Sequence, residues 1–284
     1  MASVRIAVLL DNIKFAHTIF ALPFAYTGMV LAAGGLPSWG QFLWITVAMA
    51  GARTLAMSAN RLIDAKIDAR NARTANRPLP RGIIKPADIW LVIAGSALAY
   101  FVAAWRLNVL TLRLAPVALL FLIGYSYTKR FTWASHWILG ITDGAAAAGG
   151  WIAVSGRFAP EVWVLWFAVA VWIAGFDLIY ACQDVEFDRR EGLHSLPARF
   201  GIAAALRWAR ACHLLMELSL LGLGFTMGLG LAYWFGWLVA GALLVYEHSL
   251  VHPDDLSRLN MAFFNVNGYI SVIVFMATLA DLLL

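Results

Sequence analysis

Nine apolar segments recur along the chain, and they constrain its fold more than any other feature. They lie near residues 15–34, 40–59, 87–105, 108–126, 134–154, 162–182, 204–226, 230–248 and 262–283. A helix needs about 20 mostly apolar residues to cross the hydrocarbon core of a bilayer. Of the 284 residues, 62% are hydrophobic and only 13% are charged, whereas a soluble domain carries about 25% charged residues. The sequence therefore predicts an all-α membrane protein with nine transmembrane helices, forming one domain over residues 1–284.

The Lys and Arg residues fall mainly on one side of this predicted bundle. Seventeen belong to the N-terminal side and to the loops that join even-numbered to odd-numbered segments, whereas the other side holds three, namely Arg106, Arg113 and Arg157. Because basic loops stay in the cytoplasm, we expect a cytoplasmic N-terminus, and an odd number of spans then puts the C-terminus outside. The formal net charge of +5 could indicate nucleic-acid binding, but the basic residues lie in short loops between apolar segments. That placement indicates membrane topology, so we expect no nucleic-acid partner.

The most charged stretch of the chain is 60–82, NRLIDAKIDARNARTANRPLPRG. Asn60, Asp64 and Asp68 are spaced four residues apart, which on a helix places an amide and two carboxylates in one column. Like charges at this spacing repel each other unless a cation lies between them. With several arginines beside it, the column predicts a Mg²⁺ site next to groups that bind phosphate.

A similar pattern returns 120 residues later with Asp184 and Asp188, followed by Arg189 and Arg190. Each motif lies at the predicted cytoplasmic end of a segment, which suggests an internal duplication with the site between the two halves. Carboxylates close to the hydrocarbon are costly and usually functional. Four of them facing one cavity fit divalent metal and an anionic ligand, for which a diphosphate is the expected group. The sequence has no Gly-rich phosphate loop, which disfavours a nucleotide.

Two lone charges lie deeper in the same segments, seven residues before each motif: Arg53 and Asp177. They fit either a structural ion pair with one another or a binding pocket beneath the metals, and we favour the pocket because intramembrane charges are usually functional. Arg53 could then hold a carboxylate of a second substrate through two hydrogen bonds. Asp143 and Glu217 look isolated and are interpreted as polar contacts within the bundle. His248 and His252 have no evident third metal ligand, so we interpret them as ordinary loop residues.

The two motifs resemble the aspartate-rich motifs of the UbiA superfamily of intramembrane prenyltransferases. NRLIDAKIDARNARTANRPLPRG is similar to the first and DLIYACQDVEFDRREGLHSLPARFG to the second. The resemblance spans the chain and is nearest to the 4-hydroxybenzoate polyprenyltransferase-like branch. It implies a helical barrel in the cell (inner) membrane around a cytoplasm-facing cavity. It also implies transfer of a polyprenyl group from polyprenyl diphosphate to a small aromatic acceptor in quinone biosynthesis, after Mg²⁺-assisted ionisation of the donor.

The resemblance also implies roles for individual residues. Asn60, Asp64 and Asp68 would form a first metal site and Asp184 and Asp188 a second, with two Mg²⁺ ions expected and the four aspartates as the catalytic residues. Eight residues would bind the substrates, and Asn60 would do so in addition to binding metal. They are Lys14, Arg53, Asn60, Arg73, Tyr125, Lys129, Asp177 and Tyr180. From the residues alone, Tyr125, Lys129 and Arg130 fit an ordinary membrane-interface anchor equally well.

Three functions remain open at this point. One is the 4-hydroxybenzoate prenyltransferase of ubiquinone-type synthesis. Another is a superfamily reaction on a different acceptor, such as a menaquinone precursor of the futalosine route, haem, chlorophyllide or a sugar phosphate. The third is a cation-coupled transporter, which should carry its acidic groups near the membrane midplane.

Overall fold

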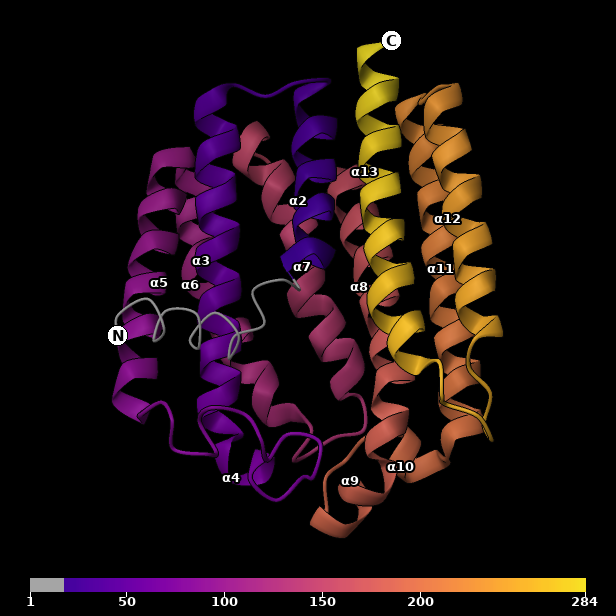
Figure 1. The fold of residues 1–284 in the computed structure, drawn as a ribbon. Helices are drawn as coiled ribbons and strands as arrows, with labels where there is room; N and C mark the ends of the chain where they lie inside the picture. The colour runs from indigo at the N-terminus through magenta and orange to yellow at the C-terminus, as the bar shows by residue number, and fades with distance from the viewer. Residues whose placement is uncertain (1–17) are drawn as a thin grey trace.

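The computed structural model describes residues 18–284, which form a bundle of long helices without any β-strand in that range (Figure 1). The long helices are α2 (Thr18–Ala33), α3 (Trp39–Ile63), α5 (Pro86–Leu107), α6 (Val109–Thr128), α7 (Ser135–Ser155), α8 (Pro160–Ala181), α11 (Ile202–Met227), α12 (Leu231–Ser249) and α13 (Asn267–Leu283). A π-helical segment, Met261–Val266, leads directly into α13. Three short helices, α4 (Ala65–Asp68), α9 (Val185–Glu191) and α10 (Leu196–Phe200), lie together at one end of the bundle (Figure 1).

Each predicted apolar segment overlaps one of these long helices. Six helical stretches among the described residues are long and apolar enough to cross a membrane: Trp39–Ile63, Pro86–Leu107, Val109–Thr128, Ser135–Ser155, Pro160–Glu191 and Met261–Leu283. Polar side chains such as Arg210, Glu217 and Glu247 lower the hydropathy of α11 and α12. The chain is therefore an integral membrane protein, and the exact number of crossings stays a prediction.

Local sequence signals explain where several helices begin and end. Ser38 caps α3 and forms a reciprocal capping box with Gln41, and Asn108 accepts a hydrogen bond from the backbone of Thr111 at the start of α6. Pro86 and Pro160 occupy the first turns of α5 and α8, where a missing amide hydrogen costs nothing. Gly156 ends α7 in a left-handed conformation that glycine adopts without strain.

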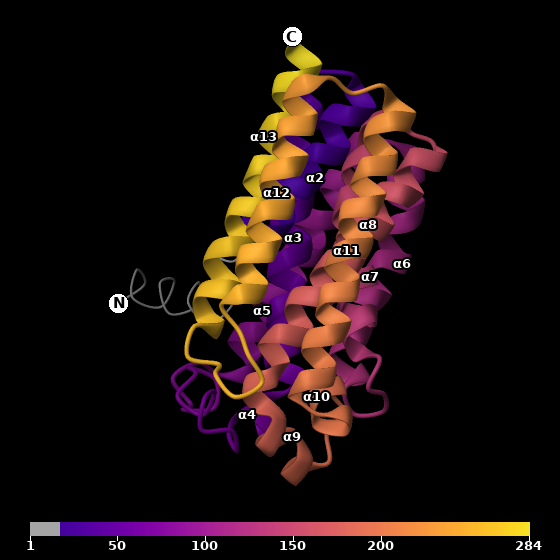
Figure 2. The same ribbon diagram turned by 90° about the vertical axis from the view of Figure 1, so that its right-hand side faces the viewer.

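The helices pack as two groups that share α7. One group contains α2, α8, α11, α12 and α13, and the other contains α3, α5 and α6. Figure 2 shows α12 and α13 running side by side along one edge of the bundle. Contacts between α2 and α7 are especially close, because a Cβ on Gly28 would collide with the carbonyl of Ala147 and one on Gly150 with the carbonyl of Ala25. Small residues allow such backbone approach in membrane helix pairs.

The two aspartate motifs lie where long helices break. Helix α3 ends at Ile63, Asp64 occupies its C-cap, and α4 follows immediately. Helix α8 ends at Ala181 and passes through a 3₁₀ turn, Cys182–Asp184, into α9. Both breaks lie at the end of the bundle that carries α4, α9 and α10 (Figure 1), so segments more than 100 residues apart meet there.

Candidate active site

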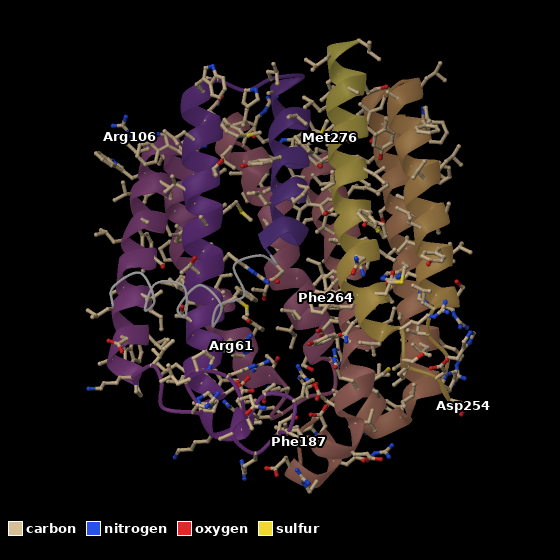
Figure 3. All side chains as sticks on the ribbon, viewed as in Figure 1. Arg61, Arg106, Phe187, Asp254, Phe264 and Met276 are labelled. Atoms are coloured by element: carbon tan, nitrogen blue, oxygen red, sulfur yellow. The ribbon has the colours of Figure 1, made fainter. Side chains whose placement is uncertain are left out.

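A cavity of about 790 Å³ opens between the two groups of helices near this end. Helices α3, α6, α7 and α8 supply most of its wall, and the rest comes from the π-helical segment and from residues in and around α4 and α9. The charged lining residues are Arg53, Arg61, Asp64, Asp68, Arg73, Arg77, Lys129, Asp143, Asp177, Asp184 and Asp188. The apolar part of the wall includes Leu139, Trp172, Ile173 and Phe176. Figure 3 shows charged side chains concentrated in the lower third of the molecule, at the level of Arg61 and Phe187.

Asp64 is the most deeply buried of the motif carboxylates, with 2% of its surface exposed. Lys129 Nζ lies 2.8 Å from its Oδ2, and Arg130 donates to its Oδ1 at 2.8 Å. The amide of Asn60 also donates to Oδ2, at 3.2 Å. A buried carboxylate is stable only when it is paired in this way. The two basic residues after α6 therefore neutralise Asp64.

Asp68 is separated from Asp64 by one helical turn, and Arg77 binds it at 2.6 Å. The expected column of Asn60, Asp64 and Asp68 is kept by backbone hydrogen bonds from Asp64 to Asn60 and from Asp68 to Asp64. It is not one continuous helix, however, because α3 stops at Ile63. The break turns the chain so that the loop after α4 can fold back and bring Arg77 to Asp68.

Asp184 joins the second motif to the loop that follows the first. Arg73 donates to both of its carboxylate oxygens, at 3.1 and 2.6 Å, and Asn71 donates to Oδ1 at 3.1 Å. Arg73 also donates to the hydroxyl of Tyr180 at 3.0 Å. Arg73 and Asp184 are 111 residues apart in the chain, so this bidentate pair closes the polar end of the cavity.

Asp188 lies on α9 and accepts a hydrogen bond from the hydroxyl of Ser195 at 2.6 Å. The Asp188 side chain is partly buried and lines the same cavity as Asp184 and Lys129. Such a carboxylate gains from any additional cation that enters the cavity.

Arg53 and Asp177 both line the cavity. They do not form the ion pair with one another that the sequence analysis considered. Arg53 contacts Asp143 at 3.3 Å, and Asp177 binds Nδ1 of His136 at 2.7 Å. The suggested Arg53–Asp177 ion pair is therefore wrong. Asp143 makes the polar contact within the bundle that was expected of it, and its partner is Arg53. The sequence separation of 90 residues between Arg53 and Asp143 explains the error, because helix neighbours of this kind depend on tertiary packing.

His136 fixes the position of Asp177. The backbone amide of Leu196 donates to Nε2 of His136 at 3.3 Å. An amide N–H can only donate, so the neutral ring carries its proton on Nδ1 and donates to Asp177. Asp177 is thereby held as a hydrogen-bonded carboxylate on the cavity wall.

The oxygen donors fit a hard divalent cation. Within residues 18–284, no three His, Cys, Asp or Glu side chains converge closely enough to hold a metal without further ligands. Mg²⁺ rarely uses such a cage, and it binds through one or two carboxylates, with waters and substrate phosphates completing its shell. Asp64 with Asp68, and Asp184 with Asp188, offer carboxylates in pairs along one cavity, which suits that mode.

Every expected site residue that the structure describes lines the cavity. Asn60, Tyr125, Lys129 and Tyr180 line it with the four aspartates, Arg53, Arg73 and Asp177. Lys14 lies outside the described residues.

Sequence reasoning did not select several residues that hold this arrangement: Asn71, Arg77, Arg130, His136, Asp143 and Ser195. Arg130 and Arg77 could have been found from their places beside Lys129 and within the first motif. His136 carries no such signal.

Residues 21–269 match the model of the UbiA prenyltransferase family. The chain belongs to that family. It is therefore a prenyltransferase, in agreement with the resemblance of its motifs.

Individual members of the UbiA prenyltransferase family resemble the chain over most of its length. The 4-hydroxybenzoate octaprenyltransferase of Aliivibrio fischeri is 30% identical over 260 residues, which cover 90% of this chain and 89% of that protein. The apo structure of a UbiA homolog from Aeropyrum pernix K1 superposes with a TM-score of 0.86 at 32% identity, covering 94% of this chain and 98% of the other. A UbiA homolog from Archaeoglobus fulgidus bound to DMAPP and Mg²⁺ has the same fold, with a TM-score of 0.70 at 18% identity over 96% of this chain and 99% of that one.

Proposed function

We propose that this protein transfers a polyprenyl group from polyprenyl diphosphate to the ring of 4-hydroxybenzoate. The observation that carries the proposal is the division of one cavity into two parts. The carboxylates and cations of the two motifs line its outer end, whereas Arg53 lies two helical turns before Asn60 on α3 and contacts Asp143, on a wall that includes Trp172 and Phe176. An amphiphilic donor and a small aromatic acid fit these two environments. The relatives named for 4-hydroxybenzoate support the choice of acceptor.

The diphosphate of the donor would lie at the outer end of the cavity. Arg73, Lys129 and Arg77 each offer a cation there that is now paired with an aspartate. Asp64, Asp68, Asp184 and Asp188 would hold Mg²⁺, for which we propose two ions, one near each pair. Bound Mg²⁺ would supply positive charge that stabilises the leaving diphosphate. The basic residues add hydrogen bonds to its oxygens.

The acceptor would lie deeper, with its carboxylate on Arg53. That guanidinium contacts Asp143 through Nη1 at 3.3 Å, and its buried Nε has no hydrogen-bond partner. Arg53 therefore has donors to offer an anionic ring substituent. Tyr125 and Tyr180 line the same cavity, and aromatic faces favour a flat ring between them.

Asp177 is the proposed acceptor of the ring proton. The allylic C–O bond of the donor breaks, the diphosphate leaves with the electron pair, and a ring carbon of the acceptor attacks the allylic carbon. The ring must then lose the proton from that carbon. The hydrogen bond from His136 holds the Asp177 carboxylate on the wall of the cavity where the acceptor would bind. A carboxylate in this position suits a general base.

We also propose nine membrane crossings, with the N-terminus and both aspartate motifs in the cytoplasm and the C-terminus outside. The distribution of Lys and Arg supports this orientation. The membrane would then give the polyprenyl chain a path to the cavity while both polar motifs stay in water.

The test uses purified protein in nanodiscs, Mg²⁺ and radiolabelled polyprenyl diphosphate. We expect label to pass to 4-hydroxybenzoate with release of one diphosphate per product. Acceptors offered in parallel are a menaquinone precursor and phenol. Transfer to the menaquinone precursor but not to 4-hydroxybenzoate would overturn the acceptor assignment, and no diphosphate release with any acceptor would overturn the proposed reaction.

A further inference from the structure

A buried polar cluster lies where α11, α12 and α13 meet. It consists of His213, Glu247, His248 and Asn267, of which Glu247 and Asn267 are 0% and 1% exposed. Asn267 donates to Glu247 Oε1 at 2.8 Å, and Nδ1 of His213 lies 3.6 Å from Glu247 Oε2 and 2.9 Å from Nε2 of His248. None of the four residues lines the cavity. Polar groups are costly inside a membrane bundle and rarely present without a role.

Asn267 connects this cluster to the π-helical segment Met261–Val266. Its side-chain amide lies 3.1 Å from the carbonyl oxygen of Ala262 and 3.2 Å from that of Phe263. A π turn widens the helix and weakens its regular backbone hydrogen bonds, so side chains often satisfy the affected carbonyls. Glu247 accepts from the same amide group and thereby fixes its orientation.

The π-helical segment places two aromatic side chains on the cavity wall, Phe263 and Phe264. Phe263 stacks on Tyr180 with ring centroids 4.1 Å apart, and Phe264 and Tyr180 form a T-shaped pair with centroids 6.0 Å apart. Figure 3 shows Phe264 in the lower half of the molecule, away from the level of Met276 and Arg106. Tyr180 in turn accepts from Arg73, which holds Asp184. The aromatic stack is therefore directly beside the charged end of the cavity.

Loss of the π turn would disturb this stack. One residue corresponds to about 100° of rotation in an α-helix, so a return to regular geometry would turn Phe263 and Phe264 relative to the rest of α13. The cavity wall beside Tyr180 would then open. Asn267, which donates to Glu247, is the member of the cluster that contacts the carbonyls of this turn.

We propose that Glu247 and Asn267 are positioning residues that hold the π turn, so that Phe263 covers Tyr180 and excludes water from the place where the donor ionises. This proposal rests on the proposed function. Once the C–O bond of the donor breaks and the diphosphate leaves with the electron pair, the allylic cation has two fates. The acceptor ring captures it and loses a proton, or water captures it and loses a proton to give a prenyl alcohol. Aromatic faces favour the cation and keep water away.

The experiment measures the ratio of prenyl alcohol to prenylated acceptor from radiolabelled donor. In Glu247→Met and Asn267→Ala we expect the ratio to rise about fivefold to tenfold, the effect of losing one aromatic contact. Glu247→Gln keeps a side-chain oxygen for Asn267, and its ratio should stay near that of the wild type.

Asp281→Ala is the matched control. Asp281 accepts from the backbone amides of Gly230 and Tyr233 at 2.6 and 3.3 Å, and so joins α13 to α12 at the other end of the pair. This variant should lower the melting temperature without changing the product ratio.

An unchanged ratio in folded Glu247→Met and Asn267→Ala, or an equal rise in Asp281→Ala, would overturn the proposal. If the cluster variants do not fold, Phe263→Leu decides the question, because it removes the stack and leaves the cluster intact. An unchanged ratio in that variant also refutes the proposal. Wild-type protein that releases no diphosphate would refute the proposed function and this inference with it, whereas normal prenylation with an insensitive ratio would refute the inference alone.

Discussion

Replacing Arg53 by alanine tests the placement of the acceptor. The Arg53 side chain is 20% exposed, and its Nη1 lies 3.3 Å from Asp143, which is long for a charged pair. Its Nε has no hydrogen-bond partner. Most of its donors are therefore available to a carboxylate. A hydrogen bond to a charged group contributes about 1.5–3 kcal/mol, which corresponds to a change of about 10- to 100-fold in affinity. We expect Arg53→Ala to raise the KM for 4-hydroxybenzoate by that factor.

Steady-state assays with each substrate varied in turn separate this effect from general damage. The KM for the prenyl diphosphate should change less than about threefold, because Arg73, Arg77 and Lys129 hold that end of the cavity. Phenol, which lacks the carboxylate, should react at similar rates with the wild type and Arg53→Ala.

Asp143→Asn distinguishes acceptor binding from a structural ion pair. It keeps the size of the side chain and removes a charge that competes with the acceptor for Arg53, so the KM for 4-hydroxybenzoate should stay the same or fall. If Asp143→Asn instead raises that KM as much as Arg53→Ala does, or if phenol is affected equally, then Arg53 serves the fold and the reasoning fails.

Three other predictions concern metal, orientation and packing. Asp64→Ala should lower kcat by on the order of 100-fold or more, and EDTA should abolish wild-type turnover until Mg²⁺ is restored; full activity in metal-free protein would contradict the assignment. Cysteines introduced into the loops 70–81 and 189–199 should react with an impermeant reagent only from the cytoplasmic side, and labelling from outside would reverse the orientation. Gly150→Leu should destabilise the protein by about 1–3 kcal/mol through collision of α7 with α2, seen as a lower melting temperature, whereas Gly149→Leu, with no atom within 4 Å of an added Cβ, should not.

The sequence predicts the helices well because the signal for each is local. About 20 apolar residues in a row must form a helix in a membrane, since no water is present to satisfy an open backbone. The spacing of Asp64 and Asp68 and of Asp184 and Asp188 is local as well. Their four-residue intervals are enough to place the carboxylates of each pair near one another.

The partners of these residues could not be predicted in the same way. Asp143 with Arg53, and His136 with Asp177, join different helices, and their contact depends on how those helices are rotated and shifted against each other. Hydropathy fixes neither variable. The π turn before Asn267 could not be predicted from the sequence either. It adds one residue to a helical turn, and a segment that is largely apolar on all sides shows no change of pattern at that point.

The charge pairs at the outer end of the cavity have a consequence for the order of binding. Arg73 donates two hydrogen bonds to Asp184, so a diphosphate without metal must compete with that carboxylate for the same guanidinium. When metal is present, Asp184 can bind the cation and release Arg73 to the diphosphate. Asp184→Asn removes the competition but also a metal ligand.

We therefore expect Asp184→Asn to bind inorganic diphosphate about tenfold more tightly than the wild type in EDTA, the effect of one charge-assisted hydrogen bond. The same variant should lose Mg²⁺-dependent turnover. Isothermal titration with inorganic diphosphate, with and without Mg²⁺, measures both arms of the comparison. Weaker metal-free binding by Asp184→Asn than by the wild type would mean that Arg73 does not exchange Asp184 for the diphosphate. In that case the aspartates and the basic residues of the cavity would act as fixed pairs, and metal and donor would have to enter beside them.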